Sequence, residues 1–178
     1  YTNTDRVLFD YDTTLYAQWT AIGYNLEIDV AQGTYTGATT VGGSIGKTIE
    51  IGTISRTGYR FDGWQVTAGE GSVAKNSSGK WIYTFGAGSG TITALWTANQ
   101  YTLTFNKNDS TASWGTIPSG FTQSGSNYSK QVTYDDTIKD MPQPTKSGYK
   151  FEGWFENTTS SIAWTPSTLY TVAENKTL

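Results

Sequence analysis

The chain contains the same seven-residue phrase twice, and this repeat constrains its fold more than any other feature. Residues 58–64 read Gly-Tyr-Arg-Phe-Asp-Gly-Trp, and residues 148–154 read Gly-Tyr-Lys-Phe-Glu-Gly-Trp. The aromatic residues, the glycines and the order of the charges are all preserved. Self-similarity of this kind is the signature of repeat architectures. We therefore expect copies of one small module, and a chain of such copies more often spans, spaces or binds than catalyses.

Two further blocks recur around this phrase. Residues 15–21 (Leu-Tyr-Ala-Gln-Trp-Thr-Ala) are echoed by residues 92–98 (Ile-Thr-Ala-Leu-Trp-Thr-Ala). Each block is followed by a tyrosine-led alternating segment, at residues 24–28 and 101–105. The order of the blocks is the same in both copies, so they fix the frame of the repeating unit.

This frame predicts three parts of the chain. Residues 1–22 are expected to be the C-terminal strand region of a preceding repeat, and residues 23–99 a complete module. Residues 100–178 form a second module. Because residues 175–178 align with residues 12–15, which precede a strand, this second module is expected to lack its last strand.

Composition indicates a β-rich extracellular protein. Only 15% of the 178 residues are charged and another 15% are aromatic, whereas about 25% of an average chain is charged. The net charge of −3 gives no basic surface for nucleic acid. No apolar run approaches the roughly 18 residues of a membrane span, so membrane insertion is not expected.

The residue types present argue against catalysis. The chain has no cysteine and no histidine, which removes the thiol nucleophile, the common zinc ligands and the commonest general base. Acidic clusters, such as Asp135 with Asp136, lack the spacing of a calcium loop and fit turns better. We therefore expect no enzyme, no cofactor and no metal site.

Alternation of apolar and polar residues is the dominant local pattern, as in Tyr24, Leu26 and Ile28. It predicts a mainly β fold, α+β at most, with small tandem modules that each hold at most one short helix. The best helix candidate is Asp135–Met141, before a proline pair, and the matching stretch of the first unit is Lys47–Ile54.

The repeated phrase itself is expected to be a core strand. Strand periodicity places Tyr59 and Phe61 on one face, opposite the charged residues. Trp64 joins that face only if Gly63 forms a β-bulge that shifts the parity. The second copy offers the corresponding residues Tyr149, Phe151, Gly153 and Trp154.

These blocks resemble the Listeria–Bacteroides repeat, which is related to the internalin B-repeat of bacterial surface proteins. The resemblance rests on Tyr101–Phe105, Gly148–Trp154 with Pro142 and Pro144 before it, and Leu15–Trp19. It implies a β-grasp-like module strung in tandem in secreted or cell-wall proteins, where it serves as a stalk or spacer that supports adhesion. Its partners would be the neighbouring repeats of the same chain.

Seven tryptophans raise the possibility of stacking on sugars. Those at repeat positions are expected in the core: Trp19, Trp64, Trp96 and Trp154. Trp114 lies in an insertion of the second unit and is the one candidate ligand-binding residue. The alternative function is therefore direct binding of a glycan or host protein around Trp114. A third hypothesis is head-to-tail strand exchange, in which Leu15–Trp19 fills the last-strand position of a neighbouring molecule.

Overall fold

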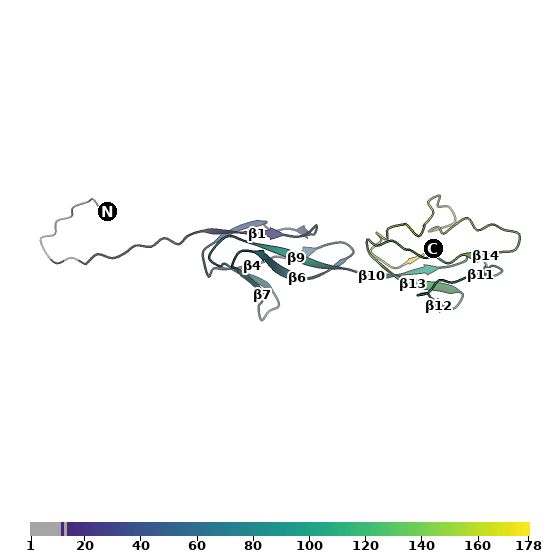
Figure 1. Cartoon of the computed structure of the whole chain (residues 1–178), viewed down its shortest axis with the longest axis horizontal. Coiled ribbons are helices and arrows are strands. Elements are labelled where there is room, and N and C mark those ends of the chain that lie inside the picture. Colours follow the sequence, from purple (N-terminus) through teal and green to yellow (C-terminus); the bar gives the residue numbers. More distant parts are fainter. Residues whose placement is uncertain (1–11, 13) are drawn as a thin grey trace.

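A computed structural model describes residue 12 and residues 14–178. Strands and connecting loops make up this part of the chain, in two modules that follow one another (Figure 1). Module 1 comprises residues 24–98 and module 2 residues 100–178. The mainly β fold expected from the alternating pattern is confirmed. No helix able to cross a membrane occurs in the described ranges.

Module 1 is built on a four-stranded mixed sheet. The strands of this sheet, in spatial order, are β3 (Thr40–Gly43), β1 (Tyr24–Asp29), β9 (Gly90–Ala98) and β6 (Tyr59–Ala68). The first and last strands of the module, β1 and β9, pair in parallel at its centre, with Leu26 opposite Gly90. Two smaller sheets complete the module: β4 (Thr48–Glu50), β8 (Trp81–Thr84) and β7 (Ser72–Lys75), and the pair β2 (Thr34–Tyr35) and β5 (Ile54–Ser55).

The core of module 1 follows the alternation of its strands. In β1, Leu26 and Ile28 are buried whereas Glu27 is exposed. The buried hydrophobic cluster contains Leu26, Ile28, Ile51, Trp64, Tyr83, Phe85, Ile92 and Ala94. Burial of these apolar side chains is the main force that holds so small a unit together.

The β-bulge expected at Gly63 is present in β6. Phe61 pairs with Trp96 and Gly63 with Leu95, so Asp62 is left over in the register. Gly63 has φ of 149°, a backbone conformation that residues other than glycine rarely adopt. Phe61 and Trp64 consequently share the inner face, where their rings meet edge to face with centroids 5.5 Å apart.

Module 2 repeats the central arrangement with fewer strands. Its four-stranded sheet contains β12 (Thr122–Ser124), β13 (Asn127–Thr133), β10 (Gln100–Phe105) and β15 (Lys176–Thr177). β10 and β15 are parallel, as β1 and β9 are in module 1. A separate pair joins β11 (Ser113–Trp114) to β14 (Pro144–Thr145). The core comprises Leu103, Phe105, Val132, Ile138, Trp154, Tyr170 and Leu178.

Neither candidate helix forms. Asp135 and Lys139 have φ of 60° and 68°, and an α-helix requires negative φ at every residue. Ile138 instead donates its backbone N–H to the Thr168 carbonyl at 3.1 Å. The matching stretch, Lys47–Ile54, contains β4 and the start of β5.

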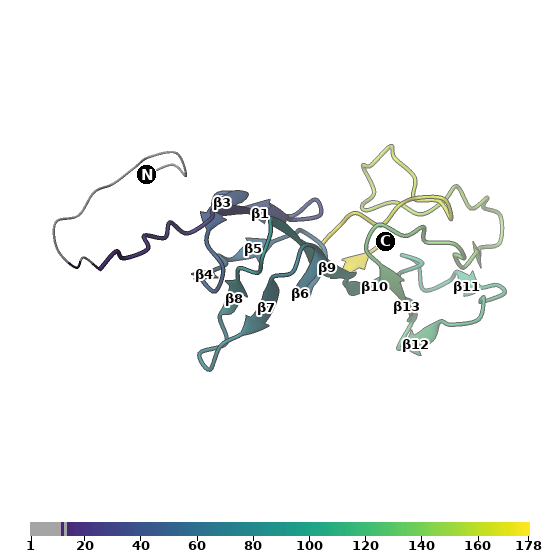
Figure 2. The same ribbon diagram turned by 60° about the vertical axis from the view of Figure 1, so that its left-hand side comes forward.

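Two expected strands are not formed. Residues 14–23 extend away from module 1 on the side opposite module 2 (Figures 1 and 2). Trp19, expected in a core, is 91% exposed because no strand in the described part of the chain pairs with its segment. In the second phrase, Tyr149 is 71% exposed, and residues 150–153 are also outside any strand. Residues 1–11 and 13 of the expected preceding repeat lie outside the described residues.

Candidate functional site

The two modules meet at a joint formed around Asn99, Gly58, Tyr59, Tyr134 and Asp135. Asn99 is the single residue between β9 and β10. Its N–H donates to the Gly58 carbonyl of module 1, and its carbonyl accepts from the Tyr134 N–H of module 2, both at 2.9 Å. Asn99 therefore takes part in the backbone hydrogen bonding of both modules. This restricts the rotation of one module against the other that an ordinary flexible linker would allow.

Tyr59 of the repeated phrase contacts both modules across the joint. Its ring meets the Tyr134 ring edge to face at 5.6 Å, and its hydroxyl donates to Asp135 Oδ2 at 2.8 Å. The guanidinium of Arg56 lies over the Tyr59 ring at 3.7 Å. The hydrogen bond to the Asp135 carboxylate, together with partial burial, raises the pKa of the Tyr59 hydroxyl. Tyr59 thus bridges a cation of module 1 and an anion of module 2.

Gly58 allows the ring of Tyr134 to pack directly against the backbone of module 1. A Cβ atom at this position would lie 2.3–2.4 Å from atoms of the Tyr134 ring. Real Cβ atoms do not come so near other heavy atoms, so the joint requires glycine here. Gly148, the same position in the second phrase, has no heavy atom within 4 Å of its Cβ position.

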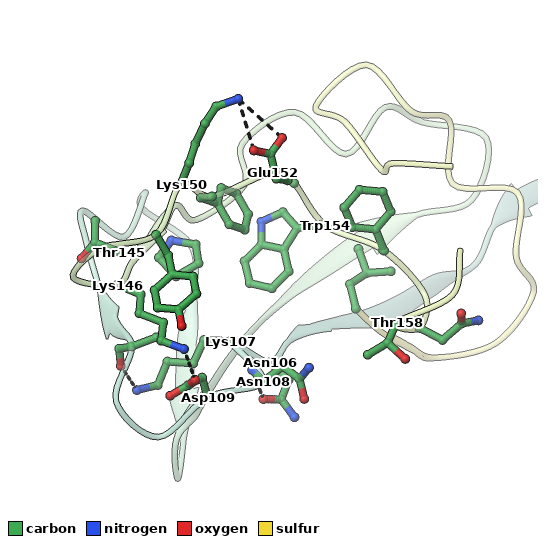
Figure 3. A pocket seen from close by; sticks show the side chains of 18 of the residues that line it. Asn106, Lys107, Asn108, Asp109, Thr145, Lys146, Lys150, Glu152, Trp154 and Thr158 are labelled. Atoms are coloured by element: carbon green, nitrogen blue, oxygen red, sulfur yellow. Dashed lines mark hydrogen bonds and ion pairs between the residues drawn. The ribbon is translucent and has the colours of Figure 1, made fainter. Parts of the chain in front are cut away.

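Module 2 contains an open groove of about 650 Å³ beside the second phrase. It is lined by charged and aromatic side chains, among them Lys107, Asp109, Lys146, Tyr149, Phe151 and Trp154 (Figure 3). Lys146 Nζ lies 2.6 Å from Asp109 Oδ2 and also 4.0 Å from the centroid of the Tyr149 ring.

The ion pair in the groove changes both pKa values. The hydrogen bond from Lys146, with two from Thr111, holds the pKa of Asp109 well below its ordinary value. The same bond raises the pKa of Lys146. Both groups are therefore charged near neutral pH, and the lining of the groove includes one positive and one negative charge that are paired.

Comparison with module 1 shows why the second phrase borders an open groove. There β9 runs along β6, and Trp96 packs on Phe61 with ring centroids 5.3 Å apart. The Trp96 indole N–H donates to the Val30 carbonyl at 3.0 Å. In module 2 the second phrase has no adjacent strand of this kind, and Phe151 is 39% exposed.

Trp114 does not stand free on the surface. Its ring stacks on Trp154 with centroids 6.0 Å apart, and Tyr128 meets it edge to face at 5.2 Å. Its indole N–H donates to the Ser126 carbonyl at 2.9 Å. The candidate ligand-binding residue is therefore packed against the core of module 2, and its polar atom already has a partner.

The remaining predicted positions divide between the two modules. Phe61, Trp64 and Trp96 come together in module 1, and Trp154 is buried in module 2. Gly153 has φ of 134°, close to that of Gly63, although no strand forms there. Trp19 remains apart from all of them.

Sequence analysis placed Tyr59 in a core strand and Asp135 in a helix, and it did not predict the joint that they form. A signal for part of it exists, because Arg56 and Lys146 both stand two residues before the repeated phrase. Each places its cation over the tyrosine of its own phrase. Tyr134 and Asp135 gave no such signal, since they lie beside the insertion, where the two units align poorly. In the described ranges, no group of three or more acidic residues could hold a metal ion.

Comparison with known families assigns both modules. Residues 24–100 match the divergent InlB B-repeat domain, and residues 101–178 match the Listeria-Bacteroides repeat domain.

Two bacterial proteins are similar in sequence to this chain. Internalin H of Listeria monocytogenes is 29% identical over 127 residues, which is 70% of this chain and 19% of that protein. A protein of Evansella cellulosilytica, whose name describes a Gly-rich membrane protein, is 28% identical over 159 residues, or 86% of this chain and 16% of its own length. The chain thus corresponds to less than a fifth of either relative. No solved structure matches it.

Proposed function

The chain belongs to the internalin-type repeats, with a divergent InlB B-repeat domain followed by a Listeria-Bacteroides repeat domain, and we propose that it is a non-catalytic spacer or stalk. In this role it holds other parts of a secreted or cell-surface bacterial protein at a set distance and so supports adhesion. The similarity to Internalin H supports this assignment.

The joint is the observation that carries the proposal. A flexible linker lets two domains reorient, and its reach grows slowly with length. Here the link is one residue, and both its backbone groups are bonded, one to each module. The Tyr59 contacts to Tyr134 and Asp135 further restrict bending. A row of modules joined in this way behaves as a stiff rod, which is what a spacer requires.

Direct binding through Trp114 has less support. A sugar-stacking platform needs an aromatic face open to solvent, whereas Trp114 stacks on Trp154 and donates its indole N–H within the module. Detectable binding of a glycan or host protein to this chain would therefore count against the spacer role.

Two measurements test the proposal. Spin labels on the exposed residues Ser77 and Ser119, one in each module, are expected to give one narrow distance distribution. A broad distribution in the unaltered chain would contradict a stiff spacer. Glycan arrays and host-protein panels are expected to give no saturable signal. A signal that Trp114→Ala removes, with the fold intact by circular dichroism, would favour the binding role instead.

A further inference from the structure

A strained turn in module 1 holds the arginine that lies against Tyr59 at the joint. We propose that Gln32 in this turn is a positioning residue, which fixes the angle between the two modules by orienting Arg56. The inference rests on the proposed spacer role, because it identifies the side chains that set the stiffness of the joint. The positioning acts through Gln32, Arg56 and Tyr59 in series.

The backbone of this turn is unusual. The Gly33 N–H donates to the Val30 carbonyl at 2.9 Å. The two residues between them, Ala31 and Gln32, have φ of 46° and 69°. Two consecutive positive φ angles under such a bond define a type I′ turn, in which Asn-Gly is the favoured pair. Alanine and glutamine are strained in this conformation because each carries a Cβ atom.

The turn does not connect the two strands of a hairpin. Type I′ turns are favoured where they join antiparallel strands that pair with each other. Here β1, before the turn, pairs with β3 and β9, whereas β2, after the turn, pairs with β5. A strained backbone persists where surrounding contacts hold it, and such positions cluster at functional places. The contacts of the turn therefore indicate its role.

Contacts with the rest of module 1 fix the turn in place. Asp29 Oδ1 accepts from the Ala31 N–H at 2.9 Å. The Trp96 indole N–H donates to the Val30 carbonyl at 3.0 Å. The ring of Trp96 also lies so close to Gly33 that a Cβ atom there would be 2.7 Å from it. The turn is thus attached to the packed part of module 1 and can serve as a rigid support.

This support holds the guanidinium of Arg56. Its Nη2 donates to Gln32 Oε1 at 2.8 Å, and its Nη1 donates to the Ala31 carbonyl at 3.4 Å. The same guanidinium lies over the ring of Tyr59 at 3.7 Å. Because an unrestrained arginine side chain has many rotamers, these two bonds keep the cation over the ring, where it is attracted to the π-system. Tyr59 in turn contacts module 2 through its ring and its hydroxyl.

The turn recurs inside module 2. Residues 106–109 follow the tyrosine-led segment of module 2 just as residues 29–32 follow that of module 1. The Asn108 N–H donates to Asn106 Oδ1 at 2.9 Å, and Asn108 has φ of 53°. The equivalent bond and the same sign of φ occur at the equivalent positions of module 1.

The cation and the tyrosine recur with the turn. Asp109 stands at the position of Gln32, and its Oδ2 lies 2.6 Å from Lys146 Nζ. Lys146 lies over the ring of Tyr149, 4.0 Å from its centroid. An acceptor in the turn, a cation and the tyrosine of the repeated phrase are therefore combined in both modules, with different residue types. Each set comes from a single module, so the arrangement is a property of the repeat itself.

Two substitutions in the turn test the role of Gln32. Gln32→Gly and Ala31→Asn each supply one half of the favoured Asn-Gly pair, but only Gln32→Gly removes the acceptor of Arg56. The measurements are the distance distribution between spin labels on Ser77 and Ser119 and the midpoint of urea unfolding. Loss of the bond in Gln32→Gly should raise the fraction of molecules with a displaced joint about three- to tenfold.

The two variants should differ in the joint and not in stability. Gln32→Gly should broaden the distance distribution and change the urea midpoint by less than about 0.5 M, because relief of strain offsets the lost bond. Ala31→Asn should leave the distribution narrow. Gln32→Glu copies the acidic residue of module 2 and should also leave it narrow, since a carboxylate accepts strongly from a guanidinium.

A double variant tests whether Gln32 acts through Arg56. Arg56→Met should broaden the distribution, and adding Gln32→Gly should broaden it no further. A narrow distribution in Gln32→Gly, or equal broadening in Ala31→Asn, overturns the inference alone and leaves the spacer role standing. A broad distribution in the unaltered chain overturns the spacer role and this inference with it.

Discussion

Alanine at the two glycines that open the repeated phrase gives a matched test of the joint. Gly58 and Gly148 have nearly identical φ, 77° and 78°. Both substitutions therefore force a side chain into the left-handed region, at a similar cost in the free energy of unfolding. They differ in one respect, since only a Cβ atom at residue 58 collides with the ring of Tyr134.

The structure sets the size of the difference. The backbone conformation alone costs about 1–2 kcal/mol at each site. In Gly58→Ala, Tyr134 must also leave its position, where it contacts Tyr59 at 5.6 Å and Tyr101 at 6.5 Å. Each aromatic pair contributes about 0.5–1.5 kcal/mol, so Gly58→Ala is expected to lose about 1–3 kcal/mol more than Gly148→Ala.

Urea unfolding followed by circular dichroism measures the free energies, and the Ser77–Ser119 spin-label distances report the geometry of the joint. Gly58→Ala should broaden the distance distribution and Gly148→Ala should leave it narrow. In a Tyr134→Ala background, the excess loss caused by Gly58→Ala should disappear, because the colliding ring is gone. Equal losses for the two variants, with unchanged distances, would refute the role assigned to Gly58 and Tyr134.

Three further predictions concern single side chains. The hydroxyl of Tyr83 is buried without a hydrogen-bond partner among the described residues, so Tyr83→Phe should leave the free energy of unfolding unchanged or raise it by up to about 1 kcal/mol; a loss of that size in urea unfolding would contradict this. Because the pKa of Asp109 is lower in the folded chain than its ordinary 3.8, the unfolded state binds more protons, and stability should fall as pH drops below about 4. Burial raises the pKa of Tyr170 from 10.0 to about 12, so its contribution is intact below pH 10 and lost as pH rises toward 12. Urea titrations from pH 2 to 12 check both windows, with Asp109→Asn and Tyr170→Phe expected to flatten the acid and alkaline limbs respectively.

The sequence predicted correctly those structural features that depend only on residues adjacent in the chain. The alternation around Phe61 and the glycine after Asp62 were enough to place a bulge and turn Trp64 inward, because strand parity is a local property. The helix proposed at Asp135–Met141 failed for a non-local reason. Its backbone is held by bonds to residues near Leu169, including a bridge between Thr137 and Leu169, and no pattern within the segment reports them.

The sequence predicted the candidate sites less well than it predicted the fold. Trp114 looked free because it falls in an insertion, yet it packs on Trp154, forty residues later. The repeat placed Trp19 in a strand, and the structure leaves it exposed since a strand needs a partner as well as a pattern. The joint depends on the contact between Tyr59 and Tyr134. These residues come together because β6 pairs with β9, β13 pairs with β10, and β9 and β10 are joined by Asn99 alone.

The parallel pairing of β1 and β9 also determines how the protein responds to pulling. Tension along the chain enters module 1 at the start of β1 and leaves at the end of β9, and these strands lie side by side in the same direction. Pulling then slides one strand along the other, so the hydrogen bonds between them are loaded together instead of opening one after another. Asn99 passes the force straight from β9 into β10, which pairs in the same way with β15. Each module is thus oriented to resist stretching along the axis in which the modules are strung.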